Sequence, residues 1–316
     1  MADVSSPAAS RPAWVLGSRG LLGAAVVRRL RGQGRSVRVT RVPWEDAHAS
    51  VETLLGAARE FALEAPDGGE VFWCAGAGVI GTSVADLDQE VDVISRFLDR
   101  WRPPAGTSLF LASSAGGLYA GASGPPFDEF TTPTPLAPYG HAKLAAEELA
   151  RAFSRRTSVP LLIGRISNLY GPGQDIAKPQ GLISQLCRAQ LTRQPLSIYV
   201  SLDTMRDYLF VEDAAAMVVH GLAEVSRAGG EHCKVLASES STTIGAILGA
   251  LHRISRRRPQ VVLGASPNAR FQVRDLRMRS SAWPATDHLA RTHLLAGISA
   301  TMASVGDQLR SAAGRR

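Results

Sequence analysis

The sequence predicts an α/β protein built on a doubly wound parallel sheet, with a smaller C-terminal lobe. Three observations support this fold class. Apolar strands alternate with helical segments between residue 13 and about residue 166, which is the order that produces a parallel sheet covered by helices. A glycine-rich turn separates the first strand from the first helix, and the pattern becomes less regular in the C-terminal third.

Size and composition agree with a folded globular protein. The 316 residues are enough for a large core and a second lobe, and 45% of them are hydrophobic while 20% are charged. The net charge of +7 comes almost wholly from scattered arginines, so we expect a dispersed basic surface and no nucleic-acid partner. No apolar run approaches the length of a membrane span, and we expect no membrane partner.

The cysteines and the N-terminus indicate a cytoplasmic protein. Cys74, Cys187 and Cys233 are widely spaced and odd in number, which fits neither a disulfide framework nor a metal knuckle. The seven histidines show no metal-ligand spacing, so we assign no metal. Residues 1–12 are rich in Ala, Ser and Pro without an apolar stretch, and we expect a disordered tail there instead of a signal peptide.

The first strand leads into a candidate cofactor site. It covers residues 13–16 and is followed by a Gly-x-x-Gly-x-x-Gly turn and a helix over residues 24–31. This order is the setting of a dinucleotide-binding fingerprint. The first glycine permits the tight turn, the second lets the backbone approach a pyrophosphate at the helix N-terminus, and the third allows close packing on the sheet. The expected cofactor-binding residues of the turn are Gly17, Arg19, Gly20, Leu22 and Gly23.

The second strand, over residues 36–41, favours NADP. An NAD-preferring site places Asp or Glu at its end to bind the ribose 2′-hydroxyl, whereas this chain has Thr40 and Arg41. Together with Arg19, Arg41 would offer two guanidinium groups to a 2′-phosphate. The alternative is that Arg41 points to solvent or stacks on the adenine. We therefore expect an NAD(P) cofactor, with NADP preferred over NAD.

Further strands and helices continue the alternation. Small residues end the buried strand at 71–78, including Ala75, and leave room for the cofactor. A strand over 108–112 carries Ser113 and Ser114 at its tip. The remaining expected elements are helices over 46–64, 86–102 and 182–191, strands over 160–166 and 196–200, and a Pro-rich loop over 121–138.

Tyr139 and Lys143 are the candidate proton-transfer pair. They stand four residues apart at the start of a segment rich in strong helix formers, so they fall on one helix face, one turn apart. A positioned ammonium lowers the pKa of a phenol and makes it a proton acceptor near neutral pH. The same spacing also occurs in ordinary surface helices. The cofactor site predicted before it is what gives the pair a function.

Five segments, in this order, resemble the extended short-chain dehydrogenase/reductase family and its nucleotide-sugar epimerase/dehydratase group. They are Gly17-x-x-Gly20-x-x-Gly23, Ser113-Ser114, Tyr139-x-x-x-Lys143, Arg165-x-x-Asn168-x-Tyr170-Gly171-Pro172, and Arg206-Asp207-Tyr208 with Val211-x-Asp213. The resemblance covers about residues 13–225. It implies a Rossmann domain over 13–166 with returns near 207–240, and a substrate-binding lobe over 167–206 and 241–316.

The resemblance also implies catalytic roles. Tyr139 would exchange the proton of a sugar hydroxyl as hydride moves to or from the nicotinamide. Lys143 would hold the nicotinamide ribose and lower the pKa of the tyrosine. The family's third member is a hydroxyl, for which we take Ser114, with Ser113 as the alternative because the spacing to Tyr119 departs from the family's pattern.

Substrate-binding residues follow from the same resemblance. Asn168 would bind the substrate at the boundary between the lobes. Arg206 and Arg270 would bind a nucleotide diphosphate, as guanidinium groups do well. The alternative for Arg206 is a structural ion pair with Asp207 or Asp213.

Departures from the family narrow the expected reaction. Ala115 and Gly116 stand where 4,6-dehydratases have Asp-Glu, so dehydration is not expected. Ala115 and Gly173 stand where epimerase-reductases have Cys and His, so 3,5-epimerisation lacks its acids. We expect a nucleotide-sugar 4-epimerase resembling those that act on UDP-sugars. The alternatives are an NADPH-dependent ketoreductase or dehydrogenase, and a non-catalytic NAD(P)-binding sensor. Family members commonly dimerise through the helices at about 86–102 and 140–156, which implies a homodimer.

Overall fold

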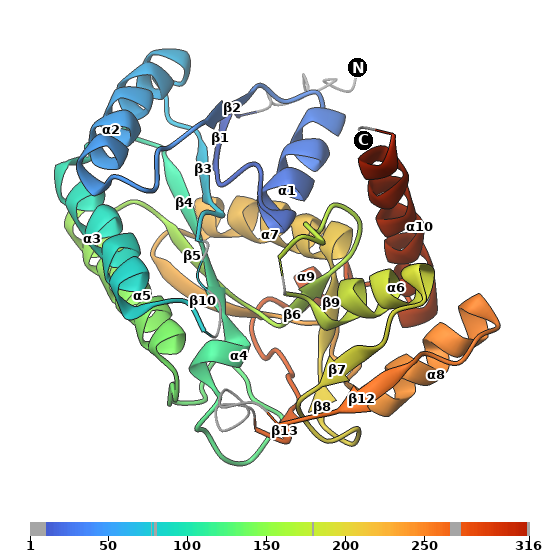
Figure 1. Ribbon diagram of the computed structural model, residues 1–316. Helices are drawn as coiled ribbons and strands as arrows, with labels where there is room; N and C mark the ends of the chain where they lie inside the picture. Colours follow the sequence, from blue (N-terminus) through green and yellow to red (C-terminus); the bar gives the residue numbers. More distant parts are fainter. Residues whose placement is uncertain (1–10, 77, 79–80, 179, 266–272, 315–316) are drawn as a thin grey trace, which may run out of the picture.

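The computed structural model describes residues 11–76, 78, 81–178, 180–265 and 273–314. It confirms the α/β class, with a parallel sheet between two layers of helices (Figure 1). The strands of the main sheet are β1 (Ala13–Leu16), β2 (Val37–Thr40), β3 (Glu70–Trp73), β4 (Ser108–Ser114), β5 (Leu161–Ile166) and β10 (Glu231–Leu236).

The order of the strands makes this a doubly wound, Rossmann-like sheet. They pair in the order β10-β5-β4-β3-β1-β2, and every pairing is parallel. The order reverses at β1, because β1 pairs with β2 on one side and with β3 on the other. Ligands of open α/β sheets bind beyond the carboxyl ends of the strands at such a reversal. The topology therefore places a binding crevice beyond the ends of β1 and β3.

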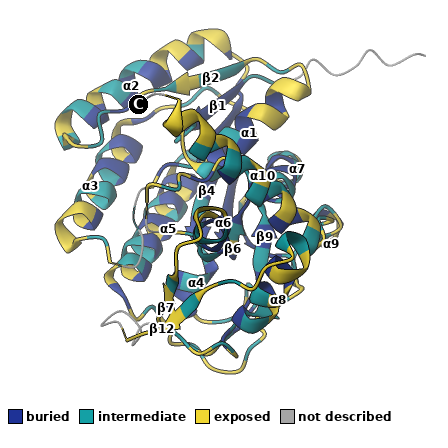
Figure 2. Ribbon diagram, turned by 45° about the vertical axis from the view of Figure 1, so that its right-hand side comes forward, coloured by how far each residue is buried: buried dark blue, intermediate teal, exposed yellow. Residues whose placement is uncertain are grey.

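Helices cover both faces because successive strand residues point to opposite sides. Trp14 and Leu16 of β1 pack into a core shared with α2 (Ala47–Glu64), α3 (Val84–Arg100) and α5 (Pro138–Thr157). Ala13 and Val15 pack on the other side against α1 (Leu21–Gly32) and α7 (Val211–Ala228). Figure 2 shows the buried strands enclosed between helices whose outer faces are exposed.

A second core lies beyond the main sheet. It packs α6 (Leu182–Thr192), α8 (Ile244–Ser255) and α10 (Leu294–Ala313) through side chains such as Leu186, Leu251 and Ile298. The smaller elements around it are β6 (Asn168–Tyr170), β7 (Leu196–Ile198), β8 (Met205–Arg206), β9 (Tyr208–Phe210), β11 (Thr242–Thr243), β12 (Val261–Leu263), β13 (Asp275–Leu276) and α9 (Pro284–Asp287), while α4 (Ala115–Leu118) follows β4 directly.

Part of the expected tail is well anchored, which corrects the boundary at residue 12. The Arg11 guanidinium donates to the Ser226 hydroxyl and to the Gly106 carbonyl, and the Pro12 carbonyl accepts a 2.9 Å bond from the Glu70 amide. Residues 1–10 of the expected tail lie outside the described residues. No helix in the described part of the chain is both long enough and apolar enough to span a bilayer.

Candidate active site

The glycine turn forms a close-fitting cradle at the strand reversal. Gly17 has a φ of +78°, and a Cβ atom there would lie 2.5 Å from the Ala75 amide nitrogen. A Cβ atom at Gly23 would lie 2.2 Å from the Gly17 carbonyl oxygen, so only glycine allows α1 to start this close to the turn. The N-cap residue Gly20 forms no side-chain cap bond, and the first amides of a helix lack intrahelical partners. These amides fit a pyrophosphate, whose charge the helix N-terminus also attracts.

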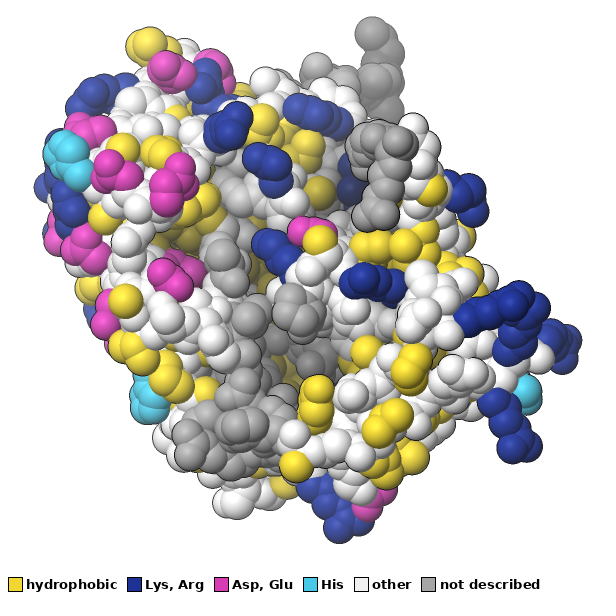
Figure 3. Space-filling model, viewed as in Figure 1, with side chains coloured by type: hydrophobic (Ala, Val, Ile, Leu, Met, Phe, Trp, Pro, Cys, Tyr) yellow, Lys and Arg dark blue, Asp and Glu magenta, His cyan; other side chains and the backbone are white. Residues whose placement is uncertain are grey.

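Two arginines remain available beside this cradle. Arg19 and Arg41 are exposed, and neither guanidinium has a hydrogen-bond or ion-pair partner among the residues the structure describes. The Thr40 hydroxyl, in contrast, accepts a 2.9 Å bond from Trp14 Nε1. Figure 3 shows that this face of the molecule is hollowed along its centre, with dark blue Lys and Arg side chains flanking the upper part of the hollow.

Tyr139 lies at the N-terminal end of α5, against α4 and the turn that follows β3. The side chain is half-buried. A Cβ atom at Gly117 would lie 3.1 Å from its Cε1, and one at Gly78 would lie 3.2 Å from its Cδ2. The Lys143 ammonium lies 5.8 Å from the centroid of the ring. The structure therefore brings the tyrosine and the lysine together beside the crevice that the strand reversal creates.

Lys143 has a partner that sequence reasoning missed. Its ammonium lies 2.8 Å from Glu90 Oε1 of α3, and both side chains are largely buried. Burial alone would lower the pKa of Lys143, but the negative charges of Tyr139 and Glu90 outweigh it and raise that pKa, so the ammonium stays charged. The sequence contains an indication of this contact, because Glu90 is a carboxylate on the same helical face as Leu87 and Ile94, and both of those residues are buried.

The two serines at the end of β4 have different surroundings. Ser113 is buried and donates a 2.6 Å bond to Glu147 Oε1. Ser114 is half-buried, and its Oγ accepts a 3.1 Å bond from the Gly117 amide as the N-cap of α4. Within the described part of the chain the Ser114 hydroxyl donates to no acceptor, so its proton is available to a substrate. The geometry favours Ser114 as the reacting hydroxyl.

A buried ion pair explains why Ser113 is occupied. Glu147 is fully buried and receives bonds from Arg165 at 3.0 Å to Oε1 and 2.7 Å to Oε2. Arg165 also donates to the Tyr119 hydroxyl at 2.9 Å, which donates in turn to the Asp128 carbonyl at 2.7 Å. Burial would lower the pKa of Arg165, but the Glu147 carboxylate raises it, and burial raises the pKa of Tyr119. Arg165, the first residue of its motif, therefore acts in the interior and not at a ligand.

Of the expected substrate residues, Asn168 lies in β6, which pairs with β9, and Arg206 lies in β8, which pairs with β11 and β13. Asn168 is exposed, and its Nδ2 donates to the Asp207 carbonyl at 2.8 Å. Arg206 is 6% exposed and donates to the Met205 carbonyl at 2.8 Å. Burial lowers the pKa of Arg206. Arg270 lies outside the described residues.

Asp207 and Asp213, the alternative partners of Arg206, accept hydrogen bonds from other donors. Asp207 accepts a 2.6 Å bond from the Ser167 hydroxyl and 2.9 Å bonds from the amide and hydroxyl of Ser238. Burial raises the pKa of Asp207. Asp213 accepts bonds from the amide and hydroxyl of Thr292 at 2.7 and 3.0 Å. These contacts do not support a structural ion pair of Arg206 with either carboxylate.

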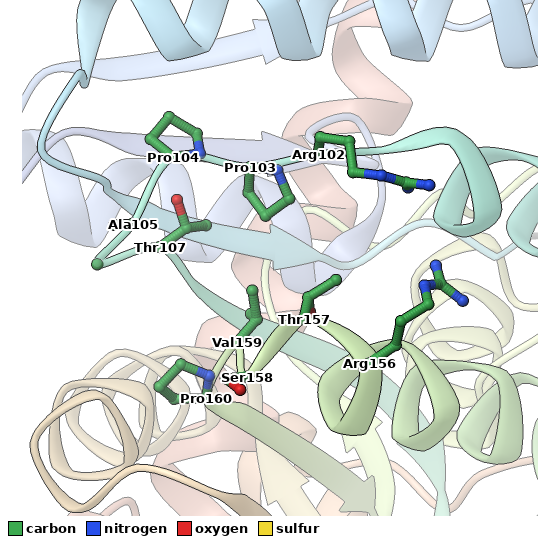
Figure 4. Close-up of a pocket in the computed structure, with 11 residues that line it drawn as sticks. Arg102, Pro103, Pro104, Ala105, Thr107, Arg156, Thr157, Ser158, Val159 and Pro160 are labelled. Atoms are coloured by element: carbon green, nitrogen blue, oxygen red, sulfur yellow. The ribbon is translucent and has the colours of Figure 1, made fainter.

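A cavity of about 580 Å³ lies at the opposite end of the sheet, where β4 and β5 begin (Figure 4). Residues 102–107 and 156–160 line it. The guanidinium groups of Arg102 and Arg156 donate at 2.8 Å to the carbonyls of Asp99 and Leu98, at the C-terminal end of α3. These arginines satisfy helix-end carbonyls, as basic residues commonly do, and the cavity is separate from the tyrosine–lysine pair.

The fold and the site define a dinucleotide-binding α/β protein with a tyrosine–lysine centre at the carboxyl edge of its sheet. The model of the NAD dependent epimerase/dehydratase family matches residues 13–235. The chain belongs to this family, and the resemblance to the extended short-chain dehydrogenases/reductases is confirmed.

Similar proteins act on nucleotide sugars, to judge from their names. A dTDP-L-rhamnose 4-epimerase of Burkholderia thailandensis is 35% identical over 94 residues, which are 29% of this chain and 26% of that protein. A dTDP-glucose 4,6-dehydratase of Neisseria gonorrhoeae is 35% identical over 129 residues, 40% of this chain and 36% of that protein. The chain thus matches only about a quarter to a third of the length of these curated relatives.

Solved structures are similar over almost their whole length. The UDP-glucose 4-epimerase of Thermotoga maritima, solved with UDP-glucose, has a TM-score of 0.78 at 20% identity, covering 94% of this chain and 99% of that one. MoeE5 in complex with UDP-glucuronic acid and NAD has a TM-score of 0.74 at 25% identity, with the same coverage. These similarities confirm the predicted fold.

Proposed function

We propose that this protein is a nucleotide-sugar 4-epimerase that acts by hydride transfer at a sugar carbon. The observation that carries the proposal is the position of Tyr139 and Lys143, which lie 5.8 Å apart from ring centroid to ammonium, beside the turn that follows β3. The family supports it, since it includes epimerases. The names of the relatives, which act on dTDP- and UDP-sugars, support a nucleotide sugar as substrate.

NAD(P) would be held at the turn of Gly17, Gly20 and Gly23, where the first amides of α1 lack intrahelical partners and fit a pyrophosphate. When bound, it supplies the hydride acceptor and donor of the reaction. We propose NADP over NAD, supported by the guanidinium groups of Arg19 and Arg41, which have no partner among the residues that the structure describes. The similar structure of MoeE5 contains NAD, so the affinities of this protein for NAD and NADP need to be compared directly.

Tyr139 would accept the proton of the sugar hydroxyl as that carbon is oxidised and return it as the carbon is reduced from its other face, so the proton balance closes over one cycle. Lys143 keeps a positive charge beside the ring and favours the phenolate. Ser114 would donate its free proton to the reacting oxygen. Asn168, Arg206 and Arg270 would bind the nucleotide diphosphate part of the substrate.

The second candidate function is a one-way NADPH-dependent reduction of a sugar or related carbonyl compound. The unpaired arginines favour it, because an epimerase only recycles its cofactor while a reductase consumes NADPH. Both functions use the same tyrosine, lysine and serine. They differ only in whether the cofactor leaves the enzyme in a changed oxidation state.

The two functions are separated by incubating the purified protein with UDP-sugars without added cofactor. A 4-epimerase interconverts the C4 epimers through cofactor that it already carries, and Tyr139→Phe abolishes the interconversion while cofactor binding persists. Stoichiometric NADPH oxidation with a carbonyl substrate would establish the reductase instead. If the wild-type protein shows neither activity, or if Tyr139→Phe keeps full activity, the assignment of Tyr139 as the proton-transfer residue is refuted.

We also propose a homodimer formed through α3 and α5. Ala146 and Phe153 pack into the protein's own core, whereas Ala142 and Ala145 remain partly exposed and available to a partner. Size-exclusion chromatography with light scattering measures the mass of the protein in solution and distinguishes a monomer from a dimer. A cytoplasmic location is supported by the three free cysteines, which a reducing compartment preserves.

A further inference from the structure

We propose that Glu90 is a positioning residue of the tyrosine–lysine pair. Its carboxylate holds the Lys143 ammonium in place and offsets its charge, so that Tyr139 keeps its proton to a higher pH than the lysine alone would allow. This inference rests on the proposed function, because it concerns the same proton-transfer centre. It adds a third charge to a centre that the sequence motif describes with two residues.

The geometry makes Glu90 part of the site. Its Oε1 lies 2.8 Å from Lys143 Nζ, and the two side chains are only 17% and 10% exposed. A Cβ atom at Gly76 would lie 2.6 Å from the ammonium and 2.9 Å from the carboxylate oxygen. The ion pair therefore packs against the turn that follows β3, next to the reversal of strand order where a dinucleotide binds.

The sign of the effect follows from Coulomb's law. The Lys143 ammonium, 5.8 Å from the centroid of the Tyr139 ring, favours the phenolate because opposite charges attract. A carboxylate in direct contact with that ammonium cancels much of its field at the ring. When the carboxylate becomes an amide, the ammonium is no longer compensated and favours the phenolate of Tyr139 more strongly.

No other charge in contact with the pair competes with Glu90 within the described residues. α4, which packs on α5, carries no titratable side chain, and β4 contributes only the hydroxyls of Ser113 and Ser114. Cys74, after β3, is held as a thiol because burial raises its pKa. Of the other titratable groups on α5 and the elements around it, Glu147 pairs with Arg165, Glu231 with Arg155 and Lys234 with Asp287, and the thiol of Cys233 is buried. Asp86 and Asp88 of α3 and His141 and Glu148 of α5 are exposed to solvent.

A purely structural role is the competing explanation. In that case Glu90 would only tie α3 to α5, and its removal would lower stability without moving the ionisation of Tyr139. Stability alone therefore does not decide the question. The ionisation of Tyr139 does, because a mechanical tie has no influence on it.

The test is a spectroscopic titration of tyrosinate near 295 nm on cofactor-free protein. Each variant is measured with and without Tyr139→Phe, and the difference isolates Tyr139 from the other four tyrosines of the chain. Three of these titrate late, since burial raises the pKa of Tyr119 and Tyr170 and raises that of Tyr208 to about 12. The variants are Glu90→Gln, which keeps a hydrogen-bond acceptor, Glu90→Asp, which keeps the charge, and Glu52→Gln. The last is the matched control, because Glu52 pairs with Arg100 on the surface and its loss changes the net charge equally.

We expect Glu90→Gln to lower the Tyr139 midpoint by about 1 pH unit, Glu90→Asp to fall between it and the wild type, and Glu52→Gln to match the wild type. An unchanged midpoint in Glu90→Gln would overturn the proposal, and so would an equal shift in Glu52→Gln. If Glu90→Gln does not fold, a Glu90→Asp midpoint at or above that of the wild type overturns it. The titration needs no turnover, so a failure of the proposed epimerisation is recognised separately from a failure of this inference.

Discussion

Alanine substitution of Ser113 and of Ser114, one at a time, separates structural from catalytic hydroxyls. Ser113 donates to a carboxylate that is fully buried, at 2.6 Å. A hydrogen bond to a charged group contributes about 1.5–3 kcal/mol, so Ser113→Ala is expected to lower the free energy of unfolding by that amount. Glu147 keeps its bonds to Arg165 in this variant, which is why the loss stays within this range. Turnover at a temperature well below unfolding is expected to change little.

Ser114→Ala is expected to behave in the opposite way. It removes the N-cap of α4, a helix of only four residues, which costs about 1 kcal/mol. It also removes the donor proposed for the reacting oxygen, and loss of such a donor lowers kcat about 10²–10³-fold. Urea unfolding monitored by tryptophan fluorescence gives the stabilities, and sugar interconversion gives kcat. A variant pair in which Ser113→Ala loses the activity while Ser114→Ala keeps it would reverse the assignment.

Three further substitutions test the rest of the site. Arg41→Ala is expected to weaken NADP binding about tenfold or more, in line with loss of one charge-assisted phosphate contact, and to leave NAD binding unchanged. Fluorescence titration measures the affinities, and Arg38→Ala is the control because that guanidinium is already bound by Glu60 and Glu64. An equal loss of affinity for NADP and NAD in Arg41→Ala would contradict the 2′-phosphate role. Gly23→Ala places a Cβ atom 2.2 Å from the Gly17 carbonyl oxygen and should weaken the binding of either cofactor at least tenfold. The control Gly32→Ala meets nothing within 4 Å and should stabilise α1 by up to about 1 kcal/mol. Equal cofactor affinities in the two glycine variants would contradict cofactor binding at the glycine turn. Glu147→Ala leaves the Arg165 charge buried and should lower the free energy of unfolding by about 3–5 kcal/mol, and a loss below 1 kcal/mol would show that the pair is not needed in the core.

Local patterns in the sequence were sufficient for the fold. The alternation of strands and helices, with apolar residues at periods of 2 and 3.6, predicts the main sheet up to β5, and the structure has strands and helices in the expected order. The glycine turn predicts the close approach of α1 to the end of β1, because its three glycines are needed where a helix starts close to a strand end. These predictions succeed because the signals are local.

Ion pairs between distant residues were beyond the reach of sequence reasoning. Glu90 and Lys143 are 53 positions apart and meet only once α3 packs beside α5. The same holds for Ser113 and Glu147, whose contact distinguishes the two serines that the motif left open. Glu90 did carry a signal, a carboxylate on an otherwise buried helical face, but its partner depends on tertiary packing. Helix boundaries, by contrast, differed from expectation by at most three residues, as at the start of α1.

The anchoring of Arg11 and Pro12 was also invisible in composition. A segment rich in Ala, Ser and Pro is expected to be disordered, yet these two residues are fixed by partners far away in the sequence, including Ser226 and Glu70. Such long-range contacts follow from where β1 enters the sheet. The composition of the preceding residues does not encode them.

The most direct test of the central claim is the fate of the C4 hydrogen during epimerisation in deuterated water. Hydride transfer to and from a bound cofactor, with Tyr139 handling only the hydroxyl proton, predicts that the product keeps protium at C4. Mass spectrometry and proton NMR of the epimerised nucleotide sugar measure this directly. Deuterium at C4 would mean that the proton is abstracted from carbon and replaced from solvent, and would contradict the account.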